Sequence, residues 1–184
     1  IKDGSVLYLN NANSEVNIQN TILTNNSVVG NGGAIAVYNG DLHITDSILQ
    51  NNTAAGVSND IYIAGGNTTF TATDANSSKI LSGIAGSGNF AKDGSGTLLL
   101  AGVNKDFTGK FDIDNGTVNY VQSSGGSFVG GQVVLDAGTT LNISNANLDN
   151  IKNLSSTSTN ATVNKTGNGN LILSSDNSGY HGIF

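Results

Sequence analysis

The feature that most constrains the fold is a repeat without gaps between residues 15–27 and residues 41–53, at an offset of 26 residues. Apolar residues align with apolar residues, as Val16 does with Leu42. A fixed period of about 20 to 50 residues is typical of a solenoid, in which each repeat stacks on the one before it. Further matches are Ile18 with Ile44, Ile22 with Ile48, and residues 35–37 with residues 61–63.

The pattern inside each repeat predicts strands. Apolar and polar residues alternate in segments such as Thr69-Phe70-Thr71-Ala72-Thr73, and alternation is the signal of a strand with one buried face. Short alternating segments are separated by Gly and Asn turns, and no window has helical periodicity. We therefore predict an all-β parallel β-helix, or β-solenoid, of about seven coils with roughly 24–26 residues each.

Asparagine pairs mark one corner of the predicted coil. Asn25-Asn26 aligns with Asn51-Asn52. Asparagine tolerates left-handed backbone angles better than most residues, and stacked amide side chains can bond along a rod. We predict that these pairs form a corner with an asparagine ladder.

A second repeat occupies the rest of the chain. Residues 90–111 align with residues 163–184 at an offset of 73, again without a gap. Lys92 aligns with Lys165, and Asn104 aligns with Asn177. We interpret this distance as about three coils of 24 or 25 residues. The other matches include Gly94 with Gly167, Gly96 with Gly169, Leu98 with Leu171, Phe107 with Tyr180, and Phe111 with Phe184.

The second repeat resembles the passenger-associated β-strand repeat of bacterial autotransporters. The resemblance rests on the pattern Lys-x-Gly-x-Gly-x-Leu-x-Leu, followed by Asn-x-x-Phe-x-Gly, and covers residues 85–184. Residues 1–84 are similar to the polymorphic outer-membrane-protein repeat, since Gly32-Gly33-Ala34-Ile35 matches its first element. Ile22 and Ile48 stand where its second element has Phe.

These resemblances imply a right-handed β-helix exported by type V secretion. The two segments would form one continuous solenoid, and we expect the chain to be a fragment of a longer protein whose C-terminal outer-membrane barrel anchors it. The implied location is extracellular or on the bacterial surface. The implied role is a rigid rod that displays or constitutes an adhesive surface. Its partner would be a surface protein or glycan of the host or of other bacteria.

Composition argues against nucleic-acid binding. The net charge is −6, the isoelectric point is about 4.4, and the seven basic residues are all Lys. Neutralising phosphates needs many Lys and Arg side chains. The polar residues are mainly Asn, Ser, Thr and Gly, and only 11% of the chain is charged. Such a surface suits weak polar contacts with a partner.

An alternative function is a polysaccharide-degrading enzyme on the same scaffold. The best carboxylate pair is Asp112 and Asp114, which would share an outward face about 6–7 Å apart. The sequence offers this pair no partner, so a solvated strand face is the favoured interpretation. A calcium loop starting at Asp112 would need an acidic twelfth residue, where Ser123 stands. We therefore assign no catalytic, cofactor-binding or metal-binding residues, and no cofactor or small-molecule substrate.

Other polar features have structural interpretations. His43 and His181 are predicted to be surface residues, and the glycines of residues 86–88 and 94–96 are predicted to form turns. Thr69, Thr71 and Thr73 suggest an ice-binding face, but such a face needs threonines in successive coils, and only this coil is expected to have them.

The chain could also be a spacer without binding activity. We also expect an exposed apolar end near Phe184, and self-association through the ends of the rod, because a solenoid needs polar caps.

Overall fold

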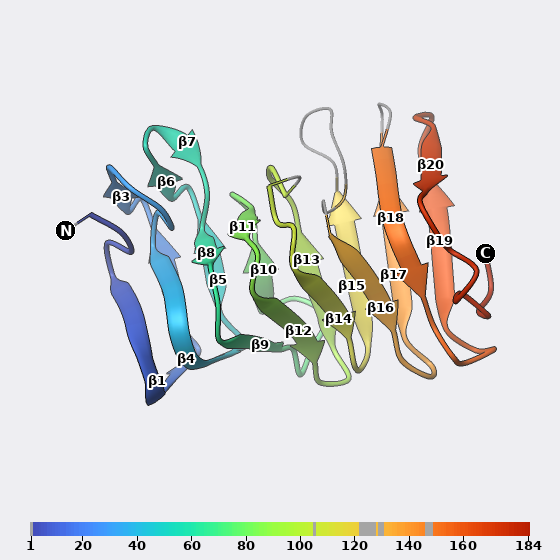
Figure 1. The fold of residues 1–184 in the computed structure, drawn as a ribbon, viewed down its shortest axis with the longest axis horizontal. Helices are drawn as coiled ribbons and strands as arrows, with labels where there is room; N and C mark the ends of the chain where they lie inside the picture. Colours follow the sequence, from blue (N-terminus) through green and yellow to red (C-terminus); the bar gives the residue numbers. More distant parts are fainter. Residues whose placement is uncertain (1, 105, 122–127, 129–130, 146–148) are drawn as a thin grey trace.

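The computed structural model describes residues 2–104, 106–121, 128, 131–145 and 149–184. Across these residues the chain forms a parallel β-solenoid of about 6 turns. Figure 1 shows the strands stacked side by side along the long axis, with the N-terminus at one end and the C-terminus at the other. No helix in the described part is long and apolar enough to cross a bilayer.

Sheet A is the larger sheet, with 10 strands. Its strands pair in parallel, and β4 is long enough to pair with β8 through its first half and with β9 through its second. The strands are β1 (Leu7–Gln19), β4 (Ile35–Thr45), β8 (Ile61–Ile63), β9 (Asn67–Thr71), β11 (Ile84–Gly86), β12 (Asn89–Asp93), β14 (Lys110–Ile113), β16 (Gln132–Leu135), β18 (Asp149–Ser155) and β20 (Leu171–Ser174).

Sheet B has 7 strands and runs in the order β19-β17-β15-β13-β10-β5-β2. A 3-stranded sheet near the N-terminal end includes a hairpin in which β6 and β7 are antiparallel. The bounds are β2 (Ile22–Thr24), β3 (Ser27–Val28), β5 (Ile48–Gln50), β6 (Thr53–Ala54), β7 (Val57–Ser58), β10 (Ser78–Ile80), β13 (Thr97–Leu100), β15 (Thr117–Val121), β17 (Thr140–Ser144) and β19 (Thr162–Thr166).

The 26-residue repeat is confirmed residue by residue. Val16 pairs with Leu42, and Ile22 pairs with Ile48. Residues 35–37 pair with residues 61–63. Parallel strands in successive coils place equivalent residues side by side, so an alignment without gaps becomes the register of the sheet.

The coils of the second half are shorter than predicted. Asn164 bonds to Asn142 over 22 residues, and Asn142 bonds to Asn119 over 23. The prediction that 73 residues span three whole coils is wrong. The first copy begins on sheet A and the second on sheet B, because Phe90 pairs with Phe111 whereas Val163 pairs with Leu141. The two copies therefore lie half a coil out of phase. The predicted right-handed winding stays a prediction.

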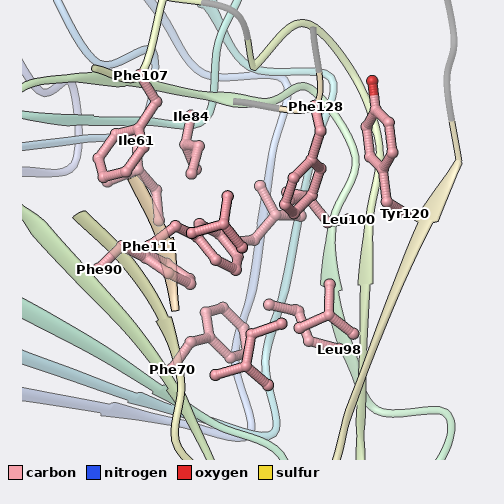
Figure 2. Packing of buried hydrophobic residues seen from close by; sticks show 14 of the residues in the cluster. Ile61, Phe70, Ile84, Phe90, Leu98, Leu100, Phe107, Phe111, Tyr120 and Phe128 are labelled. Carbon is pink, nitrogen blue, oxygen red and sulfur yellow. The ribbon is translucent and has the colours of Figure 1, made fainter. Parts of the chain in front are cut away.

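A continuous core lies between sheets A and B. Phe90 and Phe111 stack with ring centroids 4.9 Å apart, and both side chains are fully buried. Figure 2 shows these rings beside Phe70 and facing Leu98 and Leu100 from sheet B. Alternation explains the packing, since every second residue of β13 and β14 is buried.

The asparagine corner is confirmed. Asn25 and Asn51 have positive φ angles of 59° and 56°. The side-chain amide of Asn26 donates to Asn52 Oδ1 at 2.9 Å, which forms the predicted ladder. Gly33, near this corner, allows a close approach of two backbone segments, because a Cβ there would lie 2.4 Å from the carbonyl oxygen of Asn59.

The C-terminal end of the rod is apolar, as predicted. Ile183 and Phe184 are 55% and 59% exposed, and Ile172 and Leu173 of β20 are 44% and 42% exposed. Strands β19 and β20 are the edge strands of their sheets at this end, and Ile183 bonds to the backbone of Ala161 and Val163 at the start of β19. Edge strands carry unpaired backbone groups that can pair with another chain.

Candidate binding groove

A groove of about 480 Å³ lies near the N-terminal half of the rod, beside the β6–β7 hairpin. Figure 1 shows this hairpin rising from the rod above β8. The volume falls within the range of about 300–1,000 Å³ that is typical of ligand pockets. The groove is lined by Gly30, Asn31, Gly32, Ala54, Ala55, Val57, Ser58, Asn59, Tyr62, Ala85, Gly86, Ser87, Val103, Asp106 and Thr108.

A row of tyrosines leads into the groove along the outer face of sheet A. The ring centroids of Tyr8 and Tyr38 lie 5.4 Å apart, and those of Tyr38 and Tyr62 lie 5.7 Å apart. Tyr62 alternates with the buried residues Ile61 and Ile63, so its ring points outward. The row therefore brings an aromatic surface into the groove.

Hydrogen bonds hold one wall of the groove in place. Asp3 accepts a hydrogen bond from the backbone N–H of Asn31 at 2.6 Å and one from the Tyr38 hydroxyl at 2.9 Å. The Asn31 amide donates to the Tyr38 oxygen at 3.2 Å. Burial raises the pKa of Tyr38, and the Asp3 carboxylate shifts it in the same direction. Asn31 is thus fixed at the groove before any ligand binds.

Polar residues make up part of the groove lining. Asn59 is only 8% exposed, and its Oδ1 is buried and has no hydrogen-bond partner among the described residues. Such orphaned polar atoms are rare in folded proteins. Asp106 places an exposed carboxylate on the lining, and Ser58, Ser87 and Thr108 add exposed hydroxyls.

The carboxylate pair singled out from the sequence lies elsewhere. Asp112 points outward from β14, as expected, but it has a partner: Lys110 Nζ lies 2.9 Å from its Oδ1. Burial raises the pKa of Asp114, and the negative charges of Asp112 and Asp136 raise it further. Among the described residues, no group of three or more His, Cys, Asp or Glu side chains is placed to hold a metal ion. Ser123 lies outside the described residues.

The two histidines are surface residues, as predicted. The His43 side chain is 41% exposed, and its Nε2 lies 3.7 Å from Glu15 Oε1. His181 is exposed near the C-terminal end. Neither lines the groove.

A column of single threonines lies along sheet B. Thr97, Thr117, Thr140 and Thr162 pair in register, each half-exposed at the start of its strand. This column has one threonine per coil, so it does not repeat the array of Thr69, Thr71 and Thr73 that the sequence assigns to one coil. The coil expected to carry it uses Thr73 differently, since the Thr73 backbone N–H donates to Asp46 Oδ1 at 2.8 Å.

Lysines of the second repeat bind the turns. Lys92 is fully buried, and its ammonium donates to the carbonyl oxygens of Gly94, Gly96 and Asn115 at 2.6, 2.8 and 2.7 Å. Its aligned residue Lys165 donates to the carbonyl oxygens of Thr166 and Gly167. Burial lowers the pKa of Lys92 to about 8, against the opposing charge of Asp93. Lys92 thus ties together the turns of two successive coils.

Asparagines of the second repeat make equivalent bonds in both copies. Asn104 Oδ1 accepts from the backbone N–H of Ile84 at 2.9 Å, and its amide donates to Ala101 and Gly102. Asn177 Oδ1 accepts from Leu154 N–H at 2.8 Å, and its amide donates to two carbonyls. The motif residues are therefore structural. The predicted turns at Gly86 and Gly94 have positive φ angles of 106° and 80°.

Comparison with known families agrees with these motifs. The passenger-associated-transport-repeat family matches residues 90–119 and 163–182, which contain the lysines just described. Such repeats are typical of autotransporter passengers, which Gram-negative bacteria secrete or display on their surface. Searches of curated proteins and of solved structures find no match. The matched residues thus carry a repeat typical of autotransporter passengers, within a β-helical segment.

The sequence did not reveal the groove. Its lining comes from several coils and from a hairpin that interrupts the regular stacking, so no short motif encodes it. A weak signal was present in the spacing of Tyr38 and Tyr62, which is close to one coil.

Proposed function

We propose that this chain is a surface-exposed segment of an autotransporter passenger, a stiff rod that presents an adhesive surface to a host or bacterial partner. In this proposal residues 1–84 and 85–184 are two repeat classes of one continuous rod, and a C-terminal barrel in the full-length chain anchors it. The rod has no catalytic role. The observation that carries the adhesive role is the groove, where an aromatic ring and fixed polar groups are exposed together.

Stiffness follows from the stacking. Seven strands of sheet B and ten of sheet A pair in succession, and side-chain ladders reinforce the pairing. Asn119, Asn142 and Asn164 bond along sheet B at 2.7 and 2.8 Å. Each coil of a solenoid is held in place by contacts with its neighbouring coils. A groove on one coil is therefore held at a fixed place on the rod.

Adhesion is tested with beads that carry the whole 184-residue chain. Coated beads should be retained on epithelial or bacterial cell layers more than albumin-coated beads, and an excess of free chain should block retention. Retention no greater than that of albumin-coated beads would leave a spacer as the function and refute adhesion. Surface location is tested separately, by adding protease to intact Gram-negative cells that express the full-length gene. Cleavage only after lysis would contradict it.

Self-association is a further part of the proposal. The exposed apolar residues of the C-terminal end, Ile183 and Phe184 among them, lie beside the edge strands β19 and β20. Sedimentation velocity should show larger species as concentration rises. Monodisperse monomers at high concentration would contradict this contact, and they would leave the adhesive role standing.

A further inference from the structure

We propose that the groove between the β6–β7 hairpin and Tyr62 binds a neutral saccharide. This inference rests on the proposed adhesive role and specifies its ligand class. The ligand would lie with one apolar face on the Tyr62 ring while its hydroxyls meet the polar groups of the lining.

Tyr62 provides the stacking surface. In the register of sheet A it lies between Ala36 and Ala85, whose side chains are single methyl groups. The ring packs beside Tyr38, and Tyr62 lines the groove together with Ala85 and Val103. A pyranose ring has a face of C–H groups that packs on an aromatic ring, and the phenol hydroxyl adds a polar contact. The small neighbours leave room for such a ring.

The polar groups match a ligand rich in hydroxyls. The Asp106 carboxylate accepts hydrogen bonds and, being charged, makes stronger ones than a neutral oxygen. The Asn31 side chain can both donate and accept. The hydroxyls of Ser87 and Thr108 donate to the carbonyl oxygens of Ala64 and Gly86 and so offer acceptors to a sugar, and the exposed residue Ser58 adds a third hydroxyl.

The site is organised before binding. Asp3 holds the backbone N–H of Asn31 at 2.6 Å and the Tyr38 hydroxyl at 2.9 Å, and the Asn31 side-chain amide donates to that hydroxyl oxygen at 3.2 Å, so Asn31 loses less freedom when a ligand arrives. Asn59 also belongs to the lining, but it is only 8% exposed and its Oδ1 is buried beneath the groove surface, so the ligand contacts fall to the exposed residues.

Charge selects neutral ligands over acidic ones. The whole chain carries a net charge of −6. This charge repels sialic acid, uronic acid and sulfate groups. A neutral hexose or N-acetylhexosamine unit therefore fits the groove better than an acidic glycan.

The binding experiment uses the whole chain with lactose, maltose and chitobiose as probes, by saturation-transfer NMR and calorimetry. At least one of the three should bind with a Kd in the millimolar range. 3′-Sialyllactose should bind no better than lactose. Absence of binding by all three neutral sugars, or stronger binding of the sialylated one, would overturn the proposal.

Two tyrosine variants locate the site. Tyr62→Ala places at this position the residue that both neighbouring coils already carry, so the fold should persist, and sugar binding should weaken at least tenfold. Tyr8→Ala is the matched control, because Tyr8 is 50% exposed in the same row but does not line the groove. Its binding should change less than twofold. Equal effects of the two variants, or none, would refute the site.

The same variants separate this proposal from the adhesive role. If beads carrying Tyr62→Ala adhere to cells as well as the unmodified chain does, adhesion stands and the saccharide site is refuted. If adhesion is lost with Tyr62→Ala and is blocked by free sugar, both are supported. If the ligand is instead an extended peptide that binds along the exposed edge of β7, binding should persist in Tyr62→Ala and should not be blocked by free sugar. That outcome also overturns the proposal.

Discussion

Replacing Asn104 with Ala should destabilise the rod by about 3 kcal/mol, whereas the same change at Asn177 should cost about 1 kcal/mol. The two residues align in the second repeat and make the same three hydrogen bonds. They differ in environment, because Asn104 is 1% exposed whereas Asn177 is only half-buried. The comparison therefore isolates the effect of burial on one motif position.

The two predicted losses of stability follow from the number of hydrogen bonds removed and from the polar groups that lose their partner. A typical hydrogen bond contributes about 1 kcal/mol net, and a buried donor left without a partner costs about 1–3 kcal/mol. In Asn104→Ala the backbone N–H of Ile84 loses its acceptor inside the rod. In Asn177→Ala the N–H of Leu154, a residue 1% exposed, also loses its acceptor, but water can enter the half-buried space left by the Asn177 side chain, so most of the cost is recovered.

The assay combines urea unfolding followed by circular dichroism with amide hydrogen exchange. Exchange is needed because a solenoid can unfold from its ends, which breaks two-state behaviour. Exchange of the Ile84 amide should accelerate strongly in Asn104→Ala, and that of the Leu154 amide more weakly in Asn177→Ala. Equal losses in the two variants, or a loss below about 1 kcal/mol for Asn104→Ala, would refute the reasoning.

Three other predictions test the turns and the core. Burial lowers the pKa of Lys92 to about 8, below its usual value of 10.5, so the unfolded chain binds more protons between these pH values and stability rises with pH there. The difference in unfolding free energy between the unmodified chain and Lys92→Met should therefore grow by about 2 kcal/mol, in favour of the unmodified chain, from pH 7 to pH 10. Urea titrations that give the same difference at both pH values would contradict this prediction. Gly94→Ala should lower the free energy of unfolding by more than about 2 kcal/mol, because the new Cβ would lie 2.3 Å from a carbonyl oxygen. Gly56 has a similar φ but nothing within 4 Å of the Cβ position, so Gly56→Ala should cost only about 1 kcal/mol. Equal shifts of the melting temperature in the two variants would refute the steric argument. Phe111→Ala should cost about 3–5 kcal/mol, while the exposed control Ile172→Ala should cost well under 1, and comparable denaturant midpoints would contradict the core assignment.

Sequence reasoning succeeded where one coil directly repeats the next. Val16 and Leu42 could be paired without a structure, because a parallel sheet converts a constant period into register. The positive φ angles of Asn25 and Asn51 were likewise predictable from residue type and from their repetition.

The second repeat was misplaced for a physical reason. Its motif encodes a strand, a turn held by a lysine, and another strand, and these local elements are compatible with either sheet. Lys92 performs its role between β12 of sheet A and β13 of sheet B. Lys165 performs it between β19 of sheet B and β20 of sheet A. An offset of 73 residues therefore does not determine a whole number of coils.

The groove could not be predicted because it depends on tertiary placement. Asn31, Tyr62 and Asp106 come from different coils, and each is an ordinary surface residue in its own segment. Their convergence depends on the β6–β7 hairpin, which interrupts the regular stacking of coils. The sequence allowed prediction only where that stacking is regular.

Coil length in the second half is the most direct test of the account, and engineered disulfides measure it in a chain without cysteine. In the structure Thr140 pairs directly with Thr162, whereas Asn164 is two residues further along β19. Cα atoms of direct neighbours are close enough for a disulfide, and diagonal neighbours, about 7–8 Å apart, are too distant. Mild oxidation followed by mass spectrometry should give near-complete closure of the pair Thr140→Cys with Thr162→Cys, and little closure of Thr140→Cys with Asn164→Cys. The reverse result would indicate 24-residue coils and would contradict the half-coil shift between the two copies of the repeat.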